Sequence, residues 1–102
     1  MLFKAAPTIL IIDDDPDILD AVEIVLLDEG YNVMTSTNAT KVLETSTLPD
    51  LFLVDIWMSG QNGKDICIKL KNNGKTKEIP VILFSANRDT QQIAEAAGAD
   101  DY

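Results

Sequence analysis

The chain has 102 residues, of which 46% are hydrophobic, and it contains one cysteine. This length supplies one domain with a modest core, and one cysteine excludes an internal disulfide framework. The formal net charge is −9, with eleven acids against two lysines in residues 1–62, so the composition disfavours direct nucleic-acid binding and favours a cationic or metal-bearing partner.

No stretch of the sequence resembles a secretory signal or reaches the ~20 apolar residues of a membrane span. We therefore expect a soluble cytoplasmic protein with no membrane partner.

Four short apolar runs predict the strands of a sheet. Three of them, at residues 8–12, 51–56 and 80–84, are nearly unbroken and rich in β-branched or large side chains. That pattern is typical of parallel strands that are buried on both faces. A weaker run at residues 31–35 predicts a partly exposed edge strand.

A first helix is predicted after the first strand. Asp15 precedes Pro16, which suits the first helical position, so Asp15 is the expected N-cap, and Gly30 is the expected end. The spacing of its apolar residues predicts one inward face, made of Ile18, Val22, Val25 and Leu26.

Three further helices are predicted between and after the later strands. They cover residues 38–46, residues 63–73 ending near Gly74, and residues 88–97 ending at Gly98. Their expected inward residues are Val42 and Leu43 in the second helix, Ile66, Cys67 and Leu70 in the third, and Ile93, Ala94 and Ala97 in the fourth.

Alternating strands and helices predict a doubly wound open α/β sheet. In such sheets the functional site lies beyond the carboxyl ends of the strands. Polar residues stand at three of these ends: Asp13 and Asp14, then Asp55, then Ser85. We therefore expect these four side chains to converge.

Three converging carboxylates predict a metal-assisted chemistry. Each pair held 4 Å apart repels by ~4 kcal/mol at an effective dielectric near 20, and a hard divalent cation such as Mg²⁺ offsets that repulsion. With the acids neutralised, one carboxylate can attack phosphorus and become an aspartyl phosphate. The Ser85 hydroxyl could then donate a hydrogen bond to the transferred group.

The segments "ILIIDDDPDIL", "PDLFLVDIWMSGQNG", "IPVILFSA" and "AGADDY" resemble the receiver domains of two-component response regulators over essentially the whole chain. The resemblance implies a flavodoxin-like fold with strand order 2-1-3-4. It also implies Mg²⁺, with Mn²⁺ as a substitute, bound by Asp13, Asp14, Asp55 and the backbone carbonyl of Trp57. Asp55 would be the phosphoacceptor, Ser85 would respond to phosphorylation, and the partner would be a sensor histidine kinase or a histidine phosphotransfer protein.

The sequence also departs from that family. Ser59 stands where members often have proline, and Trp57, Ala86 and Asn87 are candidate modulators of the acceptor site. The family's fifth strand, with its phosphoryl-contacting lysine, and its fifth helix have no counterpart in residues 1–102. We therefore expect an incomplete receiver whose fourth-strand edge, residues 81–84, supports self-association or a swap that completes the sheet.

Two other functions remain open at this point. One is a protein-interaction module that is never phosphorylated, and the other is a Mg²⁺-dependent phosphatase with an aspartyl nucleophile, although "DDDPD" lacks the threonine of that family. Against these, we expect a stoichiometric phosphoacceptor rather than an enzyme. Cys67 is expected in the core, and a solvated face is expected for Lys69, Lys71, Lys75 and Lys77.

Overall fold

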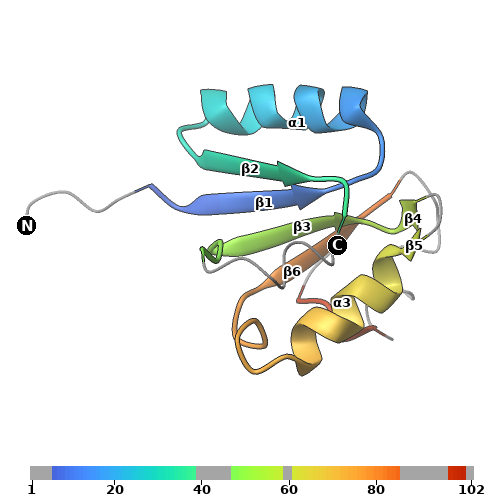
Figure 1. Cartoon of the computed structure of the whole chain (residues 1–102). Helices are drawn as coiled ribbons and strands as arrows, with labels where there is room; N and C mark the ends of the chain where they lie inside the picture. Colours follow the sequence, from blue (N-terminus) through green and yellow to red (C-terminus); the bar gives the residue numbers. More distant parts are fainter. Residues whose placement is uncertain (1–5, 39–46, 59–60, 86–96, 101–102) are drawn as a thin grey trace, which may run out of the picture.

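The structure is a computed structural model that describes residues 6–38, 47–58, 61–85 and 97–100 (Figure 1). The elements in chain order are β1 (Thr8–Ile12), α1 (Pro16–Asp28), β2 (Asn32–Ser36), β3 (Leu51–Asp55), β4 (Trp57–Met58), β5 (Gln61–Asn62), α3 (Gly63–Asn72) and β6 (Val81–Phe84).

Four of the strands form one parallel sheet in the order β2-β1-β3-β6. The predicted order 2-1-3-4 is thereby confirmed, because β4 and β5 belong to a separate antiparallel pair and β6 is the fourth strand of the sheet. The register aligns Ile12 with both Ser36 and Val54, and Asp55 with Phe84. The carboxyl ends of all four strands therefore meet at one edge of the sheet.

Helices cover both faces of this sheet, with α1 on one side and α3 on the other (Figure 1). The α3 side carries the larger core, in which the side chains of Phe52, Val54, Val81 and Leu83 are fully buried. The smaller core on the α1 side is built around Ile9, Ile11 and Leu19. Burial on both faces explains why these strands read as unbroken apolar runs.

Helix α1 begins as the sequence predicts. The Asp15 carboxylate accepts a hydrogen bond from the Asp17 N–H at 2.9 Å, and Pro16 occupies the first helical position. Gly30, with a φ of 95°, follows the last turn. This positive φ is a conformation that glycine adopts without steric cost.

The predicted inward face of α1 is partly wrong. Leu19 is buried, and Val22 and Leu26 pack against the core beneath the helix. Ile18 and Val25, which the spacing assigned to the same face, are instead 39% and 60% exposed.

The third helix agrees with its prediction, since Ile66, Cys67 and Leu70 are buried. The Cys67 thiol donates a hydrogen bond to the Ala97 carbonyl at 3.6 Å, and burial raises the thiol pKa to about 11. Of the fourth predicted helix, Ala97 is buried and Gly98 has a φ of 77°. Residues 39–46 and 86–96, which contain most of the second and fourth predicted helices, lie outside the described residues.

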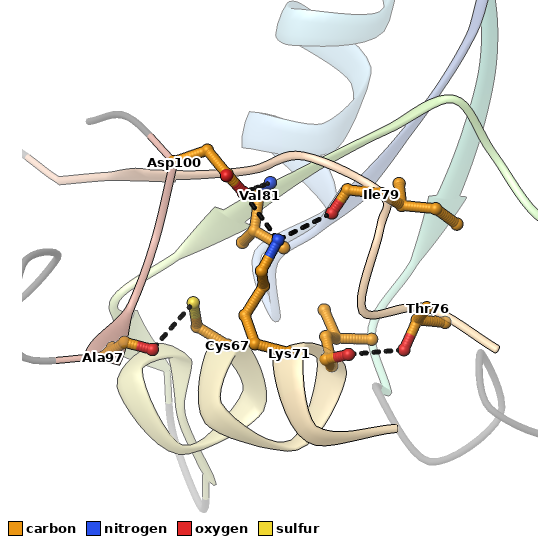
Figure 2. Close-up of polar contacts among 8 residues, drawn as sticks. Cys67, Lys71, Thr76, Ile79, Val81, Ala97 and Asp100 are labelled. Atoms are coloured by element: carbon orange, nitrogen blue, oxygen red, sulfur yellow. Dashed lines mark hydrogen bonds and ion pairs between the residues drawn. The ribbon is translucent and has the colours of Figure 1, made fainter. Parts of the chain in front are cut away.

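A polar network joins the end of α3 to the start of β6 (Figure 2). The Asp100 carboxylate accepts hydrogen bonds from Lys71 Nζ and from the Val81 N–H, both at 2.8 Å. The Asp100 N–H in turn donates to the Val81 carbonyl, and Lys71 Nζ also donates to the Ile79 carbonyl. The expectation that Lys71 belongs to a solvated face is therefore wrong, because this ammonium group is paired against the sheet.

Candidate functional site

Three carboxylates gather at the carboxyl edge of the sheet. Asp13 follows the last residue of β1, Asp14 comes next, and Asp55 is the last residue of β3. One oxygen from each lies within 4.8 Å of the others, and this is the cluster of potential metal ligands among the described residues. The convergence predicted for the three carboxylates is therefore confirmed.

Asp13 is the most deeply placed of the three, with no exposed surface. Its Oδ1 accepts a hydrogen bond from the Asp15 N–H at 3.0 Å. Its Oδ2 is buried and has no hydrogen-bond partner among the described residues. A buried polar atom normally has a hydrogen-bond partner. Because this oxygen lacks one among the described residues, it can act as a ligand to a cation.

Burial and neighbouring charge both disfavour ionisation of Asp13. Burial raises the pKa of Asp13, the Asp15 N–H opposes this rise, and the Asp14 charge adds to it. A buried carboxylate next to another carboxylate is stabilised by protonation or by a metal.

Asp55 is half-buried, and its Oδ1 accepts a hydrogen bond from the Trp57 N–H at 3.2 Å. Burial, followed by repulsion from Asp13 and Asp14, raises the pKa of Asp55 to about 6 despite that bond. At neutral pH Asp55 is therefore mainly ionised, and it is still basic enough to act as a nucleophile.

Ser85 is half-buried and directly follows β6. Its neighbour Phe84 is the register partner of Asp55, and the Phe84 carbonyl accepts a hydrogen bond from the Ile56 N–H. Ser85 thus stands one residue beyond the position aligned with the acceptor. The candidate modulators Ala86 and Asn87 lie outside the described residues.

The chain after Asp55 forms a short hairpin that the sequence reasoning missed. Trp57 pairs with Asn62 and Met58 with Gln61, and the Trp57 side chain is 50% exposed. A usable signal was the dipeptide Ser-Gly between the two pairs, because a two-residue connection with glycine is typical of hairpins. Trp57, two residues after the acceptor Asp55, therefore lies on a paired strand and not in an irregular loop.

The carboxylate cluster fits a hard divalent cation. It offers one oxygen donor from each of three acidic side chains, and Asp13 also has a buried oxygen without a hydrogen-bond partner among the described residues. Mg²⁺ prefers such a set of a few carboxylates completed by carbonyl or water oxygens.

No helix in the part of the chain that the structure describes is long and apolar enough to cross a membrane.

Comparison with known proteins gives a consistent result. The family model for the response regulator receiver domain matches residues 9–102. The DNA-binding dual master transcriptional regulator RpaA of Synechocystis is 37% identical over an alignment of 100 residues, and the match covers 94% of this chain and 42% of RpaA. The DNA-binding response regulator MtrA of Mycobacterium tuberculosis is 33% identical, over 92% of this chain and 42% of MtrA. The chain thus spans about two fifths of these relatives.

Solved structures show the same relationship. The N-terminal domain of a response regulator receiver protein from Methanoculleus marisnigri has a TM-score of 0.83 and 33% identity, and the match covers 94% of this chain and 81% of that one. TrrA from Thermotoga maritima, solved in complex with Mg²⁺-BeF, has a TM-score of 0.81 and 30% identity, over 94% and 84% of the two chains. The chain therefore belongs to the response regulator receiver domain family of two-component signalling.

Proposed function

We propose that this receiver domain accepts one phosphoryl group on Asp55 from the phosphohistidine of a sensor histidine kinase or a histidine phosphotransfer protein. Mg²⁺ would be held by Asp13, Asp14, Asp55 and the backbone carbonyl of Trp57, and Mn²⁺ could replace it. The observation that carries the proposal is the cluster of three carboxylates, in which the Oδ2 of Asp13 is buried and has no hydrogen-bond partner among the described residues.

The chemistry is a single group transfer. A carboxylate oxygen of Asp55 forms a bond to phosphorus while the phosphorus–nitrogen bond of the phosphohistidine breaks, and the departing imidazole takes up a proton. When bound, Mg²⁺ would neutralise the three carboxylates and screen the charge of the incoming phosphoryl group. The Trp57 N–H holds the Asp55 carboxylate in place, and the Ser85 hydroxyl donates a hydrogen bond to the transferred group.

Transfer would change the surface near the end of β6. The new phosphoryl oxygens attract the Ser85 hydroxyl, and Ser85 continues directly from the β6 strand. A shift of Ser85 towards Asp55 would carry the following residues with it and alter partner binding, as local charge changes do in other switches. We expect a stoichiometric acceptor rather than a turnover enzyme.

Labelling tests this function. The chain is incubated with Mg²⁺ and acetyl phosphate, and its intact mass should increase by one phosphoryl group. Asp55→Asn should remove the label, whereas Asp20→Asn, which deletes an exposed α1 carboxylate, should keep it.

The remaining results of this experiment assign the other functions. Absence of label in the wild-type chain, with no Mg²⁺ binding, would contradict the proposal and favour an interaction module. Multiple turnover of a generic phosphate ester would contradict it in favour of a phosphatase.

A further inference from the structure

Gly63, the first residue of α3, lies directly against the backbone of the acceptor residue. It is buried, and its N–H donates a hydrogen bond to the Ile56 carbonyl at 2.9 Å. A Cβ at this position would collide with the backbone oxygen of Asp55 and would lie 2.7 Å from both the Asp55 carbonyl carbon and the Ile56 Cα. These obstacles are backbone atoms, which cannot rotate away as the tip of a side chain can.

The other glycines in the described residues are different. Gly30, Gly74 and Gly98 would place a Cβ in open space. The close approach at Gly63 is therefore specific to the place where α3 meets the end of β3.

A short series of contacts connects Gly63 to the acceptor carboxylate. The Gly63 N–H donates a hydrogen bond to the Ile56 carbonyl. The next residue, Trp57, donates its own N–H to Oδ1 of Asp55. Trp57 is also paired with Asn62, whose side chain caps α3 by accepting a hydrogen bond from the Lys64 N–H at 2.8 Å. The first turn of α3 and the hairpin stem thus form one unit beneath the carboxylate.

We propose that Gly63 is a positioning residue for the phosphoacceptor site. Its missing side chain lets α3 seat on the Asp55–Ile56 peptide, which fixes the Asp55 carboxylate and the Trp57 backbone relative to Asp13. The inference rests on the proposed function in one respect, because the positioned atoms are those expected to bind Mg²⁺ and the phosphoryl group.

The direct test compares Gly63→Ala with the control Gly74→Ala. The extra methyl group at residue 63 should displace the Asp55 backbone, and loss of supporting contacts around a metal site weakens metal binding by roughly 10–100-fold. Trp57 is the only tryptophan, so its fluorescence reports Mg²⁺ titration beside Asp55. Gly74→Ala should bind Mg²⁺ like the wild-type chain.

A second pair of variants covers the case in which Gly63→Ala does not fold. Asn62→Ala removes the cap that holds the first turn of α3, and Asn62→Ser restores a capping oxygen. Asn62→Ala should weaken Mg²⁺ binding by roughly 10-fold, the lower end of the range for supporting contacts, and Asn62→Ser should recover most of that loss. Unaltered Mg²⁺ affinity in Asn62→Ala and in folded Gly63→Ala would overturn the inference.

A metal-free measurement separates this inference from the proposed function. Hydrogen exchange of the Trp57 N–H should be faster in the Gly63→Ala and Asn62→Ala variants than in the wild-type and Gly74→Ala chains. If the wild-type chain failed to bind Mg²⁺, the proposed function would fail, yet faster exchange would still support the positioning role. Equal exchange in all variants would refute that role whatever the metal does.

Discussion

Oδ2 of Asp13 is expected to lower the stability of the folded chain when no metal is bound. It is buried, has no hydrogen-bond partner among the described residues, and belongs to a side chain that clusters with two other carboxylates. Asp13→Asn keeps the oxygen that accepts from the Asp15 N–H and replaces the repelling oxygen with an N–H donor. Without metal, we expect the free energy of unfolding to rise by about 1 kcal/mol and the melting temperature by roughly 4–8 °C.

The same substitution should remove the stabilisation that Mg²⁺ gives the wild-type chain, because binding to the folded state alone raises its stability. Thermal unfolding with and without Mg²⁺ measures both effects. Asp14→Asn should follow the same pattern, and Asp20→Asn is the matched control outside the cluster. If Asp13→Asn were less stable than the wild-type chain in the absence of Mg²⁺, the carboxylate would have a structural role instead.

The raised pKa of Asp55 makes metal-free stability depend on pH. Burial and the neighbouring carboxylates raise this pKa from 3.8 to about 6, so the folded state holds the proton more tightly than the unfolded chain does. The contribution of Asp55 to stability is therefore complete below pH 4 and is lost as pH rises through 6. Melting temperatures between pH 4 and 7 in a chelating buffer should show this decline. The Asp55→Asn variant should show a smaller fall in melting temperature, because it lacks the contribution of Asp55. A wild-type slope equal to that of Asp55→Asn would contradict the assignment.

At the scale of elements, the strands were predictable because their apolar runs carry the signal themselves. The predicted range 8–12 equals β1, and the other three strands of the parallel sheet begin or end within one residue of their predictions. The site was equally predictable, because parallel strands deliver Asp13, Asp14 and Asp55 to one edge. Only the period of the sequence and the geometry of parallel sheets were needed.

The orientation of α1 could not be predicted in this way. Two sets of apolar residues follow helical spacing, because the helix has apolar residues on nearly every side. One set is Ile18, Val22 and Val25, and the other is Leu19, Val22 and Leu26. Which set turns inward depends on how the helix sits on Ile9 and Ile11. Contact between Gly63 and the Asp55 backbone depends in the same way on packing between segments, which no local pattern encodes.

The network around Asp100 makes a prediction about how elements are joined. Burial alone would raise the pKa of Asp100, but hydrogen bonds from Lys71 and the Val81 N–H outweigh it and lower the pKa. Asp100→Ala should lower the free energy of unfolding by about 1–2 kcal/mol, chiefly because the Val81 N–H loses its partner. The ion pair with Lys71 adds less, because the Asp100 side chain is 46% exposed.

A double-mutant cycle measures the coupling. Lys71→Met and Asp100→Ala should interact by about 0.5 kcal/mol or more, because the two side chains share one contact. Lys69→Met, on the exposed side of the same helix, should show no coupling with Asp100→Ala. Additive effects of Lys71→Met and Asp100→Ala would mean that the network does not join α3 to β6.

At the scale of the whole molecule, the two faces of the sheet are unequally covered. On the α3 side Phe52, Val54, Val81 and Leu83 are fully buried, whereas Leu51, Leu53 and Ile82 on the α1 side are half-buried. Helix α1 itself exposes 67% of Ile24, 60% of Val25 and 52% of Leu27. Clustered apolar surface of this kind favours association, while the net charge of −9 makes two copies repel.

Apolar attraction and charge repulsion together predict that self-association of the 102-residue chain depends on salt concentration. Added salt screens the repulsion between copies and leaves apolar burial intact, so the dimer fraction should rise with both protein and salt concentration. Light scattering from micromolar to millimolar protein measures it. The double substitution Val25→Gln and Leu27→Gln should reduce association if α1 forms the contact, because both side chains are exposed and the fold should persist. Association that survives this change would assign the contact to the β6 edge, as the sequence predicts, and a monomer under every condition would show that neither surface suffices.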